Sequence, residues 1–254
     1  MATYKKRGFK RKPFSNKEGD IGQKSATANV FNTLDEGASK TEKWVAKNQK
    51  YIFGLIGFIA IVVLGYFGYF KYIKEPREIN SMDSMFAAQR LFEQALDENN
   101  DSIYRLSING TDLKMGFLEI IDKYSGTNAS NLSNYYAGMS YLKLKDYKNS
   151  IKYLSQFNSD DQILSSLAKG SIGDCFIQLD QLEDALDYYE KAIDINTNDY
   201  TTAMYLLKAA HVSMELKKNK KSYNYFSRIK SDFPNTISAE NIDVFISKAK
   251  ALLK

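Results

Sequence analysis

Two patterns of apolar residues divide the chain. From Tyr51 to Phe70 the sequence reads YIFGLIGFIAIVVLGYFGYF, a run of 20 residues without a charge. From Ser81 onward the apolar residues recur at a helical period instead, as in SMFAAQRLFEQAL and LKMGFLEIIDKY, which predicts amphipathic α-helices. The pattern therefore predicts one long apolar helix followed by an all-α body.

The apolar run is long enough to cross a membrane. At about 1.5 Å per residue it spans about 30 Å, which is the thickness of a bilayer's hydrocarbon core. A cleaved signal peptide would have a shorter apolar run and a cleavage site of small residues, and neither is found here. Aromatic residues at both ends fit the belts of a membrane-spanning helix. We therefore predict one transmembrane helix over residues 51–73, retained as an anchor.

Four glycines of this run fall on one face of the predicted helix: Gly54, Gly57, Gly65 and Gly68. At about 100° per residue they lie within an arc of about 80°. Such a smooth face lets a second membrane helix approach closely. Glycine is also common in membrane helices that make no such contact, so both interpretations stay open.

Charge is distributed unevenly on the two sides of the run. The whole chain has a net charge of +5, but residues 1–50 have a balance of +7 and residues 75–254 a balance of −4. Positively charged flanks stay in the cytoplasm. We therefore expect a bacterial inner-membrane protein with a cytoplasmic amino terminus and a periplasmic body.

The basic segment itself, residues 1–50, has a composition typical of a largely disordered cytoplasmic tail. Aromatic residues alternate with Lys and Arg in its first 14 residues. This stretch could contact anionic lipid headgroups or ribosomal RNA, or it could serve only to set the topology. Because the body is acidic, the sequence holds no other indication of nucleic-acid binding.

The body nearly repeats itself three times, over residues 134–157, 169–196 and 206–234. Two sets of small residues align between the copies, namely Gly138, Gly173 and Ala210 and, 12 positions later, Ser150, Ala185 and Ser222. The spacings between copies are 35 and 37 residues. A period of this length is typical of a solenoid in which each unit buries its apolar face against the next.

These copies resemble the tetratricopeptide repeat, a helix–turn–helix unit of 34 residues. Family positions are matched by Tyr141, Phe176, Ala185, Ala192, Phe226, Ile229 and Pro234, whereas Ser213 departs from the family's Tyr. The resemblance implies an all-α tetratricopeptide-repeat solenoid over residues 74–254. Its expected parts are a divergent leading repeat at 81–125, repeats at 131–164, 166–199 and 203–236, and a capping helix at 237–254.

The resemblance also implies a groove lined by the first helix of each repeat. Transferring the family's groove positions gives Leu132, Tyr135, Met139, Leu142, Ile177, Met204, Leu207, His211 and Met214, together with Lys143, Leu167, Gly170, Asp174, Gln178 and Glu215. Because the set is mainly apolar and includes adaptable methionines, it favours an apolar segment or a partner domain as the ligand. The Lys/Asn set that clamps a peptide carboxylate in some family members is absent. The alternative is that several of these residues only pack between repeats.

The sequence predicts no catalytic, cofactor-binding or metal-binding site. His211 is the only histidine and Cys175 the only cysteine, so neither has a partner of its own kind for metal binding. We expect His211 to be a structural or surface residue and Cys175 to pack at a helix contact. Motifs for phosphate binding, metalloproteases or activated nucleophiles are missing from the sequence. We therefore expect a protein that is not an enzyme.

A basic tail, one membrane helix and an exported repeat domain together resemble the ancillary subunit of the SecYEG translocon. The resemblance implies SecYEG, a membrane-anchored periplasmic peptidyl-prolyl isomerase and emerging polypeptides as partners. Two alternatives stay open. One is a scaffold of another envelope assembly, such as outer-membrane protein insertion or a secretion or gliding machinery, and the other is a cytoplasm-facing adaptor with the reverse topology.

Overall fold

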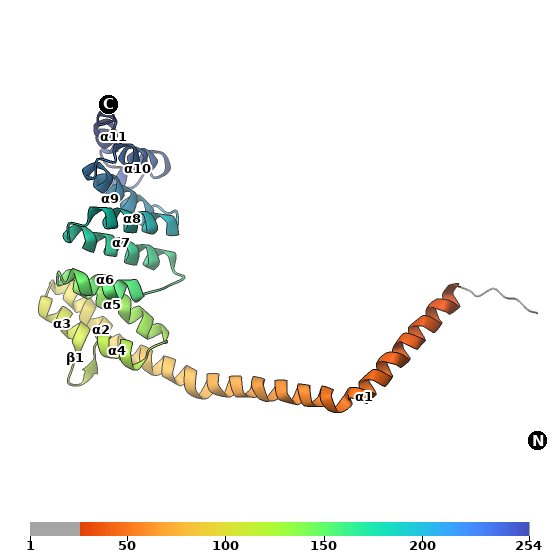
Figure 1. The fold of residues 1–254 in the computed structure, drawn as a ribbon. Coiled ribbons are helices and arrows are strands. Elements are labelled where there is room, and N and C mark those ends of the chain that lie inside the picture. Colours follow the sequence, from red (N-terminus) through yellow and green to blue (C-terminus); the bar gives the residue numbers. More distant parts are fainter. Residues whose placement is uncertain (1–25, 254) are drawn as a thin grey trace, which may run out of the picture. The chain divides into compact units, whose positions relative to one another are not determined.

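The structure is a computed structural model that describes residues 26–253 (Figure 1). The basic stretch predicted to contact lipid or RNA, residues 1–14, lies outside the described residues. The chain divides into two compact units, Met1–Tyr66 and Phe67–Lys254, which are described separately below. Within the described residues, the secondary structure is helical except for one two-stranded hairpin.

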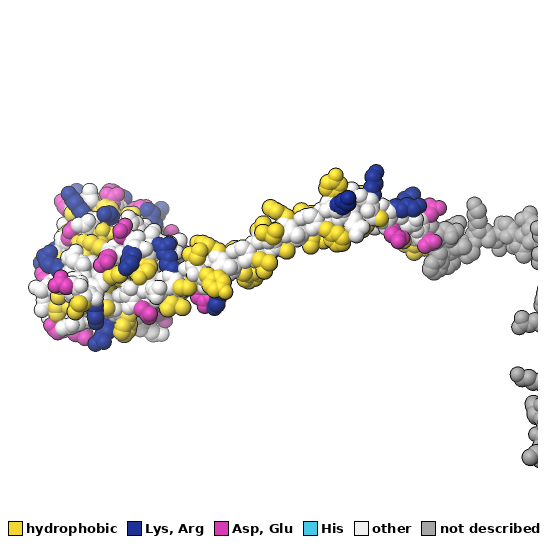
Figure 2. Space-filling model, turned by 90° about the horizontal axis from the view of Figure 1, so that it is seen from below, with side chains coloured by type: hydrophobic (Ala, Val, Ile, Leu, Met, Phe, Trp, Pro, Cys, Tyr) yellow, Lys and Arg dark blue, Asp and Glu magenta, His cyan; other side chains and the backbone are white. Residues whose placement is uncertain are grey.

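The first unit contains most of helix α1, Ala26–Tyr69. We predicted a largely disordered tail up to residue 50, and the structure differs because the helix already begins at Ala26. The charge-free run exposes its large side chains, with Tyr51 at 79% and Leu64 at 70%. Figure 2 shows hydrophobic side chains along this helix, with charged ones toward its amino-terminal end. By length and composition, the helical segment Thr33–Glu98 contains the one span among the described residues that could cross a membrane.

The four glycines of the predicted contact face lie in open space. Apart from the backbone of its own helical turn, a Cβ atom added at Gly54, Gly57, Gly65 or Gly68 would meet no described atom within 4 Å. The face is therefore sterically free to receive another helix, and the contact itself stays a prediction.

Helix α1 continues into a π-helical turn, η1 (Phe70–Lys74), and then into α2 (Glu75–Glu98). The start of α2 is fastened to the loop that joins α4 (Phe117–Lys123) to α5 (Asn128–Lys143). Arg77 Nη2 donates to the carbonyl oxygens of Lys123 at 3.1 Å and Ser125 at 3.2 Å. Glu78 Oε1 accepts from the backbone N–H of Asn128 at 2.7 Å. The pair thus satisfies groups that the ends of two helices leave unbonded.

The leading part of the second unit differs from the predicted helix pair. After α2 come α3 (Asp101–Asn109), the strands β1 (Gly110–Thr111) and β2 (Lys114–Met115), and α4. The helix predicted for LKMGFLEIIDKY begins only at Phe117, because Lys114 and Met115 pair with β1 in an antiparallel hairpin. Gly110 has a φ of +84°, and a Cβ on Gly116 would overlap the backbone at Gly110. Two glycines thus place a hairpin where the apolar period predicted a helix.

Three helical hairpins follow, stacked one on the next (Figure 1). Their helices are α5, α6 (Tyr147–Gln156), α7 (Gln162–Gln178), α8 (Leu182–Ile195), α9 (Thr201–Glu215) and α10 (Asn219–Asp232).

All three hairpins turn in the same way. The turn residues Lys145, Asp180 and Lys217 have φ values of 61°, 58° and 58°. The N–H of the residue after each one bonds back to the first helix, from Asp146 to Tyr141 O, from Gln181 to Phe176 O and from Lys218 to Ser213 O. This is a Schellman cap, which ends a helix by using its last free carbonyls. The third copy therefore turns as the first two do, although Ser213 replaces the aromatic residue.

The aligned small residues lie where the two helices of each hairpin touch. A Cβ on Gly138 would lie 2.5 Å from Leu154 Cγ, and one on Gly173 would lie 2.6 Å from Tyr189 Cε1. The remaining aligned residues are fully buried: Ala210, Ser150, Ala185 and Ser222. The prediction that these positions are helix contacts is confirmed.

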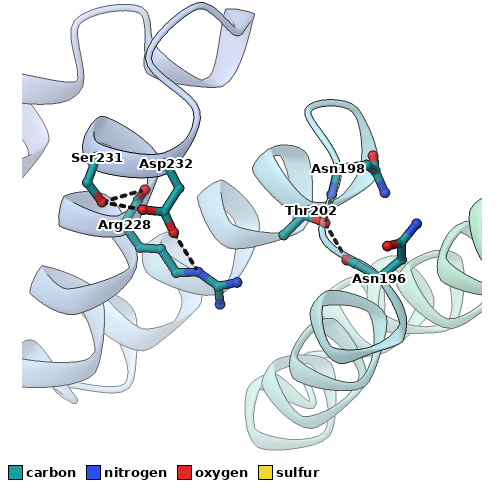
Figure 3. A network of polar contacts seen from close by, with 6 residues as sticks. All are labelled: Asn196, Asn198, Thr202, Arg228, Ser231 and Asp232. Carbon is teal, nitrogen blue, oxygen red and sulfur yellow. Dashed lines mark hydrogen bonds and ion pairs between the residues drawn. The ribbon is translucent and has the colours of Figure 1, made fainter.

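The loop between α8 and α9 is held by its own polar side chains (Figure 3). Thr202 Oγ1 donates to the carbonyl oxygen of Asn196 at 2.6 Å and accepts from the N–H of Asn198 at 3.0 Å. At the far end of α10, Arg228 and Asp232 form an ion pair at 3.3 Å, and Ser231 Oγ donates to Asp232 at 2.7 Å. The chain then forms a 3-10 turn, η2 (Ile237–Ala239), and α11 (Ile242–Ala251), which packs on α10 where a capping helix was predicted.

Candidate protein-interaction surface

The candidate site is the surface formed by the first helix of each hairpin, α5, α7 and α9, here called the first-helix face. These helices are neighbours, since α7 lies against both α5 and α9. The structure places every predicted groove residue on them. Ten are half-buried: Leu132, Tyr135, Met139, Leu142, Leu167, Asp174, Ile177, Met204, Leu207 and Met214. Gly170 is buried, and four are exposed: Lys143, Gln178, His211 and Glu215.

Most of these half-buried residues also pack against the core. Leu132 and Met139 touch the two clusters around Phe117 and Ile172, and Ile177 and Met204 touch the cluster around Leu206. Each therefore has one side in the protein and one side toward solvent. The face is consequently apolar, and it is held in place by the core beneath it.

The middle helix of the face, α7, has a glycine, Gly170, at the point where Tyr205 of α9 packs against it. A Cβ on Gly170 would overlap the ring of Tyr205, which is 2% exposed and stacks on Tyr189 with ring centroids 5.9 Å apart. Burial raises the pKa of Tyr205, and the neighbouring Asp174 carboxylate, with the phenols of Tyr135 and Tyr200, raises it further. The ring of Tyr205, from α9, therefore fills the space above Gly170 of α7.

One ion pair joins the second and third repeats on this face. Lys208 Nζ lies 2.6 Å and 2.8 Å from the two carboxylate oxygens of Asp174, which also accepts from the hydroxyl of Tyr189 at 2.7 Å. Burial and the Asp174 carboxylate together raise the pKa of Tyr189, so its hydroxyl stays a donor. Asp174 was predicted as a groove residue that could face a ligand. In the structure its carboxylate forms an ion pair with Lys208 of the same chain. The face therefore presents no unpaired carboxylate at this position.

His211 lies toward the end of the face, between α9 and the last helices. Its ring meets Phe226 and Phe245 edge-on, with centroids 5.3 Å and 5.0 Å apart. Partial burial of the ring against these two aromatic residues, with a smaller contribution from Lys248, lowers the pKa of His211 and favours the neutral ring. This agrees with the expectation of a structural or surface histidine.

Cys175 is fully buried, and its thiol donates to Ser150 Oγ at 3.2 Å. Burial raises the pKa of the thiol to about 11, which disfavours the reactive thiolate. The prediction that Cys175 packs at a helix contact is confirmed. Among the described residues, no group of three or more His, Cys, Asp or Glu side chains could hold a metal ion.

A second apolar surface was missed by the sequence reasoning. A cavity of about 770 Å³ lies between α2 and the β-hairpin, lined among others by Phe86, Arg90, Leu91, Leu113 and Met115. Phe86 is 61% exposed and Leu113, at the tip of the hairpin, is 93% exposed. The signal that could have revealed it is the pair Gly110 and Gly116 around the turn, which the helical period concealed.

The chain was also compared with known proteins. Two models of the tetratricopeptide repeat match it, over residues 133–160 and 168–199. The chain contains tetratricopeptide repeats. The matches cover parts of α5–α6 and of α7–α8, the hairpins that carry the first and middle helices of the face. No curated protein matches significantly.

Two solved structures have similar folds at low sequence identity. The MamA protein has 16% identity and a TM-score of 0.48, over 67% of this chain and 88% of its own. A substituted kinesin light chain from Podosopora anserina, with nearly identical TPR-like repeats, has 9% identity and a TM-score of 0.47, over 68% of this chain and 85% of its own.

Proposed function

We propose that the protein is a membrane-anchored, non-catalytic interaction module whose first-helix face binds apolar segments of other proteins. The observation that carries this proposal is the row of half-buried apolar residues along three adjacent helices, including Leu142, Met204 and Met214. Solenoids of this kind present such surfaces to partners. Flexible methionines suit partners of varied sequence.

The anchor in this proposal is the charge-free part of α1. Nearly all of its large side chains are exposed, from Tyr51 to Phe70. In water an apolar surface of this size would be unfavourable, whereas in a bilayer it is solvated by lipid. The charge balance on the two sides favours a cytoplasmic amino terminus and a periplasmic repeat domain. A reporter fused at the C-terminus tests this, since periplasmic enzyme activity is expected and cytoplasmic activity would reverse the topology.

Within this class, the resemblance in layout favours an accessory of the Sec translocon as the specific role. The module would then receive emerging polypeptides beside SecYEG, together with a membrane-anchored peptidyl-prolyl isomerase. The four-glycine face of α1 offers a contact for a translocon helix. Replacing Gly57 and Gly65 by Leu should lower co-purification with SecYEG from detergent extracts. A translocon recovered without the wild-type protein would contradict this role and leave the interaction module standing.

The binding face is tested by two charge insertions. Leu142→Glu and Met214→Glu each place a carboxylate among half-buried apolar residues, so capture of exported polypeptides by crosslinking should fall at least about tenfold. Ser155→Glu, on the exposed side of α6, is the matched control and should bind as the wild type does. Equal thermal midpoints for all variants would show that folding is kept. Undiminished crosslinking in both face variants would contradict the proposal.

A further inference from the structure

The part of α1 that precedes the charge-free run is an amphipathic helix. At about 100° per residue, Val30, Leu34, Ala38, Trp44 and Val45 fall within an arc of about 120°. The large residues of this arc are exposed: Val30 56%, Leu34 63%, Trp44 61% and Val45 42%. No partner within the described residues covers them. This row of residues on one face of residues 30–48 is called the apolar stripe below.

Polar residues within the stripe turn their hydrogen-bond donors back to the helix. Thr41 Oγ1 donates to the carbonyl oxygen of Gly37 at 2.9 Å, and Asn48 Nδ2 donates to that of Trp44 at 2.8 Å. These bonds satisfy the hydroxyl hydrogen of Thr41 and one of the two N–H groups of the Asn48 amide. They lower the cost of bringing these two side chains out of water.

Charged residues of both signs occupy the other side of the helix. Lys40, Lys43, Lys47 and Lys50 fall within an arc of about 80°, roughly opposite the stripe, and Glu36 falls within the same arc. The lysines follow Asp35 and Glu36 in the sequence and so lie nearer to the membrane run. Figure 2 shows dark-blue side chains together with magenta ones beyond the hydrophobic stretch. Lysines on the polar side of such a helix can reach anionic headgroups while the apolar side is immersed.

Geometry separates two arrangements of this segment. If α1 continued straight out of the bilayer, Trp44 would lie about 10 Å and Val30 about 30 Å beyond the hydrocarbon edge. If the segment lay along the surface, both residues would sit at the same shallow depth.

We propose that residues 30–48 form an interfacial helix that lies on an anionic lipid surface, with Val30, Leu34, Trp44 and Val45 inserted below the headgroups. The inference rests on the proposed membrane anchor, which brings the stripe to the bilayer. The apolar stripe fits the acyl boundary, and the lysines nearest the membrane run fit the anionic headgroups, with Asp35 and Glu36 at the end of the segment farther from the anchor. The segment would then fix the orientation of the anchor, and its binding to the membrane surface would depend on the content of anionic lipid in that leaflet.

The test uses the full chain in vesicles, because Trp44 is the only tryptophan. The protein is reconstituted in phosphatidylcholine with and without phosphatidylglycerol, and Trp44 fluorescence is quenched either by acrylamide from water or by brominated lipid. In anionic vesicles we expect strong quenching by the lipid and acrylamide quenching reduced by at least about threefold relative to neutral vesicles at high salt. A second form, Trp44→Phe with Val30→Trp, moves the probe to the far end of the stripe and should give the same result.

A matched pair of variants separates the two sides of the helix. Leu34→Glu puts a charge into the stripe and should return Trp44 to acrylamide, whereas Ser39→Glu puts the same charge on the polar side and should change little. Lipid quenching at position 44 but not at position 30 would mean an upright helix and would overturn the inference. Protection from acrylamide without lipid quenching would mean a protein partner and would overturn it too.

Retention in the membrane is measured on the same samples by a carbonate wash. If the protein stays with the vesicles while both tryptophan positions report water, the interfacial helix is wrong and the anchor stands. If the wash removes the protein, the anchor itself is wrong and the interfacial helix fails with it.

Discussion

Gly170 illustrates how one absent side chain sets the packing of three helices. The ring of Tyr205 occupies the space where a Cβ would be, and from there it stacks on Tyr189. Tyr189 in turn donates to Asp174, which is paired with Lys208. A chain of contacts therefore runs from α7 to α9, on to α8, back to α7 and again to α9. It begins at a glycine that the repeat alignment placed in the groove.

This packing predicts that Gly170→Ala is destabilising despite the better helix propensity of alanine. Overpacking a buried contact costs about 1–3 kcal/mol, which exceeds the gain of about 1 kcal/mol from removing a helical glycine. The measurement is the free energy of unfolding in urea, with Tyr205→Leu and the double variant completing a cycle. Because the two residues compete for one space, the double variant should be less destabilised than the sum. Additive effects would contradict the steric account.

At the scale of helices, the three repeats share the Schellman cap that ends their first helix, whereas the residues at the turn differ. The three turns share a positive φ and the same backbone bond although their residues differ, as Lys145, Asp180 and Lys217 show. The part of the domain before the three hairpins, α2 to α4, is stabilised differently. There the α4–α5 loop is held by side chains of α2. Arg77 and Glu78, two adjacent residues near the start of α2, bond to opposite ends of that loop. The part of the chain that follows the anchor is thus fixed to the repeat domain.

We predict that removing these contacts loosens the α4–α5 junction locally. Arg77→Ala with Glu78→Gln should destabilise by about 0.5–2 kcal/mol, the usual effect of losing a helix cap. Hydrogen exchange should quicken in residues 117–131 while the α9–α10 hairpin is unchanged. Glu75→Gln is the control, because Glu75 pairs with Lys71 on its own helix. Faster exchange throughout the domain would mean that the contacts support the whole fold instead.

At the scale of the whole molecule, the two units differ in how far their large apolar side chains are exposed. Large apolar side chains are exposed along α1, whereas the repeat domain buries its own in continuous clusters. An array of this size can bury a core without metal or disulfide. The repeat domain should therefore fold without the helix that precedes it.

A fragment of residues 75–254 tests this independence, since it keeps Arg77 and Glu78 and lacks the charge-free run. It should be soluble without detergent and unfold in one cooperative transition followed by circular dichroism. Its midpoint should lie within a few degrees of that of the domain in the full chain. The full chain is the control, and it should aggregate when detergent is removed. An unfolded or aggregating fragment would contradict the division into two units.

Features that depend on local periodicity and composition could be predicted from the amino-acid sequence alone. These are the charge-free run, the three helical hairpins, the small residues at their contacts and the packing role of Cys175, because each leaves a pattern within one repeat or one helix. The amphipathic start of α1 also had such a pattern, but the polar composition of the tail hid it.

Features that join distant positions became visible only in the folded chain. The spacing of apolar residues predicted a helix from Leu113 onward, but residues 110–115 form a β-hairpin. The hairpin forms because the backbone at Gly116 packs directly against the backbone at Gly110. The pairing of Asp174 with Lys208 spans 34 residues, and the docking of Arg77 on the α4–α5 loop spans up to 48. No local propensity encodes these contacts. They form only when the stacking of helices brings a charge and its partner, or a glycine and a ring, to the same place.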